Sequence, residues 1–76
     1  MSADRPVFAL RNEFITLGQL IKALDLIDSG AEAKAYLAES SILINGENDT
    51  RRGRKIRPGD EVTLPDGSIL EITAAN

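Results

Sequence analysis

The sequence predicts a compact α+β domain in which two short N-terminal helices pack on a small antiparallel β-sheet. Apolar residues with helical spacing occupy residues 16–39, and short β-branched runs separated by turn residues occupy residues 42–72. The chain has 76 residues, of which 42% are hydrophobic and 28% are charged. This composition is typical of one folded domain, so we expect residues 1–76 to form a single unit.

The first helix is expected to begin at a capping box. Residues 1–6 are interpreted as a flexible lead-in, and residues 7–10 as a short strand that covers an edge of the core. Thr16 is followed three residues later by Gln19, so each side chain can bond to the backbone of the other. The apolar positions that follow have the spacing i, i+3, i+4 and i+7 and predict one buried stripe, formed by Leu17, Leu20, Ile21 and Leu24.

A second capping box predicts the second helix. Ser29 is expected to cap this helix, with the Glu32 side chain reaching back to the cap. Residues 25–28 form a short linker, which favours an antiparallel or strongly angled helical pair. The apolar face of this helix is predicted from the spacing of Ala33, Tyr36 and Leu37.

Turn residues divide the second half of the chain into strands. Residues 42–44 are β-branched or apolar, and Asn45-Gly46 predicts a type I′ turn after them. Pro and Gly within residues 57–60 stand where a type II turn requires them. The remaining elements are expected to be a strand at residues 61–64, a turn at residues 65–67 and a final strand at residues 68–72.

Basic residues are concentrated in residues 51–57, called the basic segment below. The chain has nine basic and twelve acidic residues, for a net charge of −3. Five of the basic residues lie in this segment, which contains no acid; the other positions keep four bases against twelve acids, a net −8. Such a concentration of charge favours a polyanionic partner, nucleic acid above all. The five cations are Arg51, Arg52, Arg54, Lys55 and Arg57.

The composition argues against an enzyme. The sequence contains no His, the commonest general base and metal ligand, and no Cys, which serves as a nucleophile and a soft metal ligand. No catalytic residue, metal or cofactor is therefore predicted. No apolar run approaches the roughly 18 residues that span a membrane. The start of the chain shows no signal-peptide pattern. We therefore expect a cytoplasmic protein without a membrane partner, and a monomer.

Four stretches together resemble a known family. They are residues 29–34 (SGAEAK), 42–47 (ILINGE), 51–56 (RRGRKI) and 58–60 (PGD). Their order and spacing resemble the RNA-binding domain first named from ribosomal protein S-four (the αL motif), and in particular its free-standing bacterial members of the YaaA and YbcJ type. The resemblance covers roughly residues 14–64. It implies a compact αL fold that presents a basic surface to structured RNA of the ribosomal or transfer RNA class.

The resemblance also implies which residues contact RNA. Many members have Arg directly after the Ser that starts the second helix, whereas this chain has Gly30. The positions that match the RNA-binding surface are Ser29, Gly30 and Lys34 at the second helix, Asn45 and Gly46 in the turn, and Arg51, Arg52, Arg54 and Lys55 in the basic segment. Arg57 is added on charge alone, although it starts the Pro-Gly turn and can point away.

Each of these features also has a simpler interpretation. Lys34 could pair with Asp28 or Glu39, Ser29 could serve only as a cap, and Asn45-Gly46 is explained by turn geometry. The aromatic residues Phe8, Phe14 and Tyr36 are expected in the core, because so small a domain needs them there. With so few aromatics, recognition of RNA shape and backbone is favoured over broad base stacking.

Two functions from different classes remain open. In the first, three to five cations neutralise RNA phosphates, which predicts a log–log salt slope of roughly −2 to −4. In the second, the protein is an interaction adaptor whose basic segment binds an acidic protein surface. Competition with nuclease and heparin separates the two.

Overall fold

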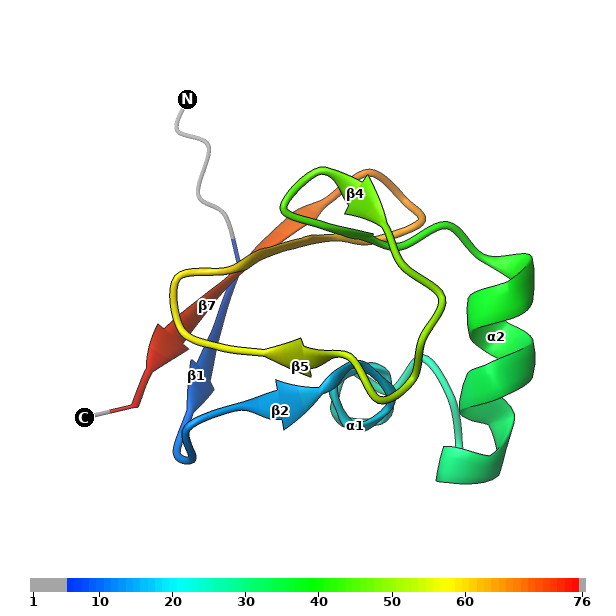
Figure 1. Cartoon of the computed structure of the whole chain (residues 1–76), viewed down its shortest axis with the longest axis horizontal. Coiled ribbons are helices and arrows are strands. Elements are labelled where there is room, and N and C mark those ends of the chain that lie inside the picture. The colour runs from blue at the N-terminus through cyan, green and yellow to red at the C-terminus, as the bar shows by residue number, and fades with distance from the viewer. Residues whose placement is uncertain (1–5, 76) are drawn as a thin grey trace.

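A computed structural model describes residues 6–75 and confirms the α+β class (Figure 1). The lead-in predicted for residues 1–6 lies outside this part of the chain, apart from Pro6. In chain order the elements are β1 (Val7–Leu10), β2 (Ile15–Thr16), α1 (Leu17–Ala23), a 3-10 turn (Gly30–Glu32), α2 (Ala33–Glu39), β3 (Leu43–Ile44), β4 (Glu47–Asn48), β5 (Lys55–Ile56), β6 (Glu61–Thr63) and β7 (Ile69–Ala74).

The sheet is mixed and not wholly antiparallel as predicted. Five strands lie in the order β1-β7-β6-β3-β4, and β2 pairs with β5 in a separate two-stranded ribbon. All pairs are antiparallel except β1 with β7, which run parallel with Val7 opposite Glu71. A parallel pair needs a long connection, and here the connection is the rest of the domain. In Figure 1 this pair lies on the side of the molecule away from α2.

Helix α1 has the predicted cap. The Gln19 amide donates to Thr16 Oγ1 over 3.3 Å, and the Thr16 amide donates to Gln19 Oε1 over 3.1 Å. Of the predicted stripe, three residues are fully buried and Leu24 is partly buried against the core. The helix ends in a Schellman arrangement, with Asp25 at φ 65° and the Leu26 amide bonded to the Ile21 carbonyl over 3.0 Å.

The predicted capping box of the second helix is wrong. Ser29 makes no side-chain capping bond, and a 3-10 turn over Gly30–Glu32 precedes α2. The Glu32 side chain does reach back, but to the amide of Asp28 over 2.8 Å. The tighter 3-10 turn moves the first α-helical residue to Ala33, so the capping spacing measured from Ser29 no longer applies. Figure 1 shows α2 strongly angled to α1, as predicted.

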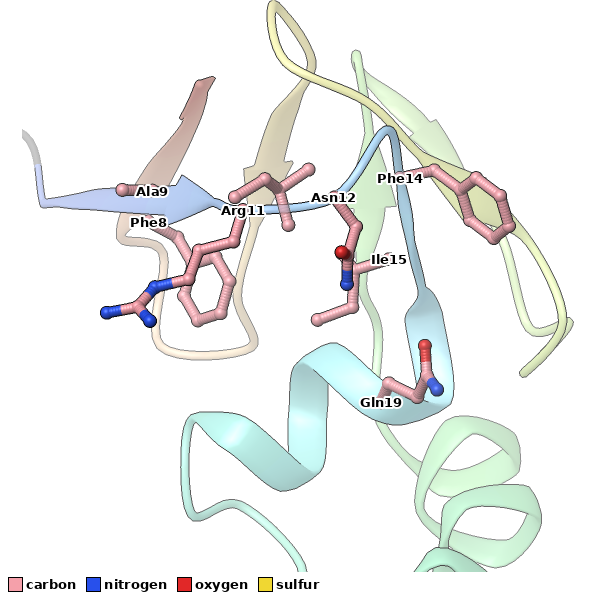
Figure 2. A pocket seen from close by; sticks show the side chains of 8 residues that line it. Phe8, Ala9, Arg11, Asn12, Phe14, Ile15 and Gln19 are labelled. Carbon is pink, nitrogen blue, oxygen red and sulfur yellow. The ribbon is translucent and has the colours of Figure 1, made fainter. Parts of the chain in front are cut away.

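The hydrophobic core lies between the helices and the sheet. Phe8 and Tyr36 pack against it as predicted, but Phe14 does not. In Figure 2 the Phe14 ring points away from Phe8 and Ile15. The buried residues come from nearly the whole length of the described chain: Leu10, Leu17, Leu20, Ile21, Ile27, Ala33, Leu37, Ile42, Ile44, Ile56, Val62, Leu70 and Ile72.

Asn45 ties the β3–β4 turn to the neighbouring strand. The predicted turn is confirmed, with φ of 53° at Asn45 and 87° at Gly46. Asn45 Oδ1 accepts from the Glu61 amide over 2.9 Å, and its Nδ2 donates to Asp60 Oδ1 over 3.1 Å. The Asp60 amide bonds to the Arg57 carbonyl, and Gly59 has φ of 100°, which confirms the Pro-Gly turn. The Asn45 side chain therefore fixes one end of the basic segment.

We predict that Asn45→Ala destabilises the fold by roughly 2 kcal/mol, because it removes two side-chain hydrogen bonds and places Ala at positive φ. Urea unfolding measures the change. Asn48→Ala is the matched control, since Asn48 is exposed in β4. Equal losses in the two variants would contradict the bridging role of Asn45.

Candidate nucleic-acid interface

Backbone hydrogen bonds hold the basic segment against α1. The Leu17 amide donates to the Arg54 carbonyl and the Gly18 amide to the Arg52 carbonyl, each over 2.8 Å. Figure 1 shows this segment passing beside α1 on its way from β4 to β5. Because the carbonyl groups face the helix, the backbone of the segment is fixed while Arg51, Arg52 and Lys55 stay exposed.

The amides at the start of α1 are all in use. The segment accepts the hydrogens of Leu17 and Gly18, and the Thr16 side chain accepts that of Gln19. A helix N-terminus is otherwise a ready anion site, since its first amides lack partners in the helix. Here those amides donate to the protein's own carbonyl and hydroxyl oxygens, so an anion must be bound by the side chains of the segment.

Gly18 allows the close approach of three elements. A Cβ atom at this position would lie 3.3 Å from both the carbonyl oxygen and the Cβ of Arg52, and 3.6 Å from the Cβ of Ala33 on α2. The sequence analysis did not single out Gly18. The signal was present, however, because Gly is unfavourable inside a helix unless a close contact requires it.

Asp49 pairs with two cations of the basic segment. Its Oδ1 accepts from Arg51 Nε over 3.1 Å and from the Arg51 amide over 2.9 Å, and its Oδ2 accepts from Arg51 Nη2 over 2.9 Å. Arg54 Nε lies 3.3 Å from Oδ2. The Asp49 side chain is 12% exposed, whereas that of Arg51 is 73% exposed. The predicted cluster is therefore partly neutralised by an acid that lies two residues before it.

This pairing lowers the pKa of Asp49 to about 2. The side-chain hydrogen bond from Arg51 is the largest cause, and its effect exceeds the opposing effect of burial. The backbone amide of Arg51 and the positive charges of Arg51 and Arg54 act in the same direction. Asp49 thus stays ionised at every physiological pH and remains available to pair with Arg51.

The other cations of the segment lie in two different surroundings. Arg52 and Lys55 are exposed and make no ion pair with an acid within residues 6–75. Arg52 borders a shallow concavity that Gly18, Lys22 and Gly30 also line. Lys55 and Arg57 instead stand over the ring of Phe14, with Lys55 Nζ 4.9 Å and the Arg57 guanidinium carbon 5.9 Å from its centroid.

The structure brings only some of the predicted α2 residues toward the segment. Gly30 shares the concavity with Arg52, and Ser29 next to it is exposed. Lys34 is exposed on the first turn of α2, and no ion pair with Asp28 or Glu39 forms in the described structure. Lys22, which the sequence analysis did not single out, lines the same concavity as Arg52.

The described residues show two further properties that bear on function. None of the helices in residues 6–75 is long and apolar enough to cross a membrane. Within the same residues, no three side chains of His, Cys, Asp or Glu gather in a way that could hold a metal ion.

Comparison with known proteins places these features in a family. The model of the S4 domain family matches residues 8–73. A curated relative, the "Probable ribosome maturation protein RlbA" of Bacillus subtilis (strain 168), is 48% identical over 56 residues. The aligned region covers 74% of this chain and 79% of the relative.

We predict that Gly18→Val destabilises the protein by roughly 1 to 3 kcal/mol, because its Cβ would lie 3.3 Å from the Arg52 carbonyl oxygen and the segment would have to shift. Thermal unfolding measures the loss. Gly30→Val is the matched control, since a Cβ at Gly30 meets nothing within 4 Å. If Gly18→Val were as stable as this control, the close approach would not constrain the fold.

A second prediction concerns acid stability. The pKa of Asp49 is lowered on folding from 3.8 to about 2, so its stabilising contribution is complete above pH 4 and is lost as the pH falls towards 2. Asp49→Asn should cost about 1 kcal/mol at pH 6, after allowance for solvent screening. The difference from the parent should shrink at pH 2.5.

Urea unfolding at pH 6, 4 and 2.5 tests this prediction. Glu39→Gln serves as a control, because it removes one acid from an exposed position of α2. A stability difference for Asp49→Asn that stayed constant over the whole pH range would show that the ion pair does not cause it.

Proposed function

Because the chain belongs to the S4 domain family, we propose that it is a non-enzymatic RNA-binding protein that docks its basic segment on structured ribosomal RNA during ribosome maturation. The name of the Bacillus subtilis relative supports ribosomal RNA over transfer RNA as the target. The absence of His and Cys from the sequence supports a binding role over a catalytic one.

The observation that carries this proposal is the fixed backbone of the basic segment. Hydrogen bonds to Leu17 and Gly18 hold its carbonyl groups, so its cations are presented to solvent in a defined arrangement. Binding then neutralises phosphates and releases counterions, which is the main source of affinity for a polyanion. A segment held in place before binding loses less conformational entropy when it meets RNA.

We assign different roles to the cations. Arg52 and Lys55 are the primary phosphate contacts, since neither is paired with an acid within the described chain. Arg51 contributes through the N–H groups that Asp49 leaves unused, because a guanidinium carries five donors. Arg54 is half-buried and positions the segment. Further contacts come from Arg57, from Lys34, Ser29 and Gly30 on the α2 side, and from Lys22.

The acidic remainder of the chain supports a single docking orientation. Outside the basic segment the sequence carries a net charge of −8. Acidic surface repels the phosphate backbone, so RNA approaches most favourably toward the basic segment. The charge asymmetry of the chain therefore serves orientation as well as affinity.

Crosslinking of the protein to cellular RNA, followed by sequencing, tests the proposal. We expect enriched fragments of ribosomal RNA. Arg52→Gln should weaken binding to an enriched fragment about tenfold and reduce the log–log salt slope by about 1. Arg11→Gln is the matched control, because it removes the same charge from an exposed position outside the segment.

Two outcomes would contradict the proposal. One is a parent protein that enriches no RNA above background. The other is a set of protein complexes that survive nuclease and heparin, which would favour an acidic protein partner for the basic segment. An unchanged affinity of Arg52→Gln would contradict only the assignment of Arg52.

A further inference from the structure

Phe14 is an aromatic residue outside the core that has two cations beside it. Its ring is absent from the side chains that pack against the core. Lys55 Nζ lies 4.9 Å and the Arg57 guanidinium carbon 5.9 Å from the ring centroid. Phe14 lines a shallow pocket together with Phe8 and Ile15, and Figure 2 shows its ring directed away from those two side chains.

The β2–β5 ribbon places these three side chains together. Ile15 pairs with Ile56, and Thr16 pairs with Lys55. Because side chains alternate along a strand, Ile56 enters the core while Lys55 and Arg57 face the opposite side. Phe14 precedes Ile15 and therefore shares that outer side. The half-buried ring thus stands outside the core cluster and borders the basic segment.

We propose that Phe14 is a stacking platform for one unpaired nucleobase of the bound RNA, with Lys55 and Arg57 holding the phosphates on either side of that nucleotide. This inference rests on the proposed RNA-binding function and specifies that Phe14, Lys55 and Arg57 bind an unpaired nucleotide of the RNA. Two cations complement a nucleotide's phosphates, and the ring complements the face of its base.

An unpaired base fits this site better than a paired one. The faces of paired bases are covered by their neighbours in the stack, so only a bulged or looped nucleotide can lie on the ring. Exposed cation–π contacts are weak, and the 5.9 Å contact of Arg57 lies near their outer limit of about 6 Å. Both cations can therefore turn from the ring to the phosphates as a base stacks.

The remaining surface of the domain serves the paired part of the RNA. Of the described cations only Lys55 and Arg57 stand over an aromatic ring, so the end of the segment with Arg51 and Arg52 recognises the sugar–phosphate backbone alone. The platform then distinguishes a helix that carries an unpaired nucleotide from a perfect helix. Such a distinction gives selectivity without reading base sequence, because every base has a face that can stack.

Two hairpin RNAs with the same stem test the platform, one fully paired and one with a single bulged adenine. We expect Phe14→Leu to weaken binding of the bulged hairpin roughly tenfold and to leave the paired hairpin within about twofold. Phe8→Leu is the matched control, since the Phe8 ring packs against the core. It should leave the preference for the bulge unchanged.

A second variant supplies a direct signal. The sequence contains no Trp, so Phe14→Trp introduces a single indole at the platform. Its fluorescence should be quenched by the bulged hairpin and much less by the paired one, and its affinity for the bulge should be retained. Unfolding curves of all variants establish that they are folded at the temperature of the binding measurements.

The outcomes separate the platform from the function on which it rests. Equal binding of both hairpins by the parent, with no effect of Phe14→Leu, would overturn the platform and leave RNA binding in place. Failure of the parent to bind either hairpin, together with an absence of crosslinked cellular RNA, would overturn both.

Discussion

The first two amides of α1 hold the basic segment in place, and much of the structure follows from that contact. Leu17 is fully buried, so its amide would lie in the interior without an acceptor if the Arg54 carbonyl moved away. The same bonds bring Arg52 so close that a Cβ at position 18 would lie 3.3 Å from its carbonyl oxygen and could be accommodated only if the segment shifted. The residues that contact RNA in our proposal are thus part of the packed domain and not an appended loop.

This arrangement concentrates positive charge, and Asp49 relieves part of the repulsion. It pairs with Arg51 and Arg54, whereas Arg52 and Lys55 have no acidic partner within residues 6–75. Asp49 therefore pairs with arginines that shape the segment, and other cations of the segment remain available for RNA. Functional sites commonly hold like charges close together, and the repulsion between them is tolerated because other interactions of the fold compensate for it.

Features decided by neighbouring residues could be predicted from the sequence. The Thr16–Gln19 cap and the Asn45-Gly46 turn depend on local chemistry alone, and both are confirmed. The 3-10 turn before α2 was not predicted, because the spacing of Ser29 and Glu32 is also compatible with a capping box. The parallel β1–β7 pair and the outward position of Phe14 depend on strand register between distant segments, which spacing along one segment does not reveal. Asp49 was overlooked because the acid-free window began two residues after it.

The pairing of β1 with β7 also affects how the chain reaches its native state. Val7 lies in the first strand of the domain, yet its partner Glu71 lies in the last. Without β7, β1 pairs with no other described strand, and Leu10 lacks its partner Ala74. Contacts between such distant positions slow folding, because a long loop must close before they form. A chain that lacks β7 therefore holds an incomplete core, because Leu70 and Ile72 of this strand are buried in it.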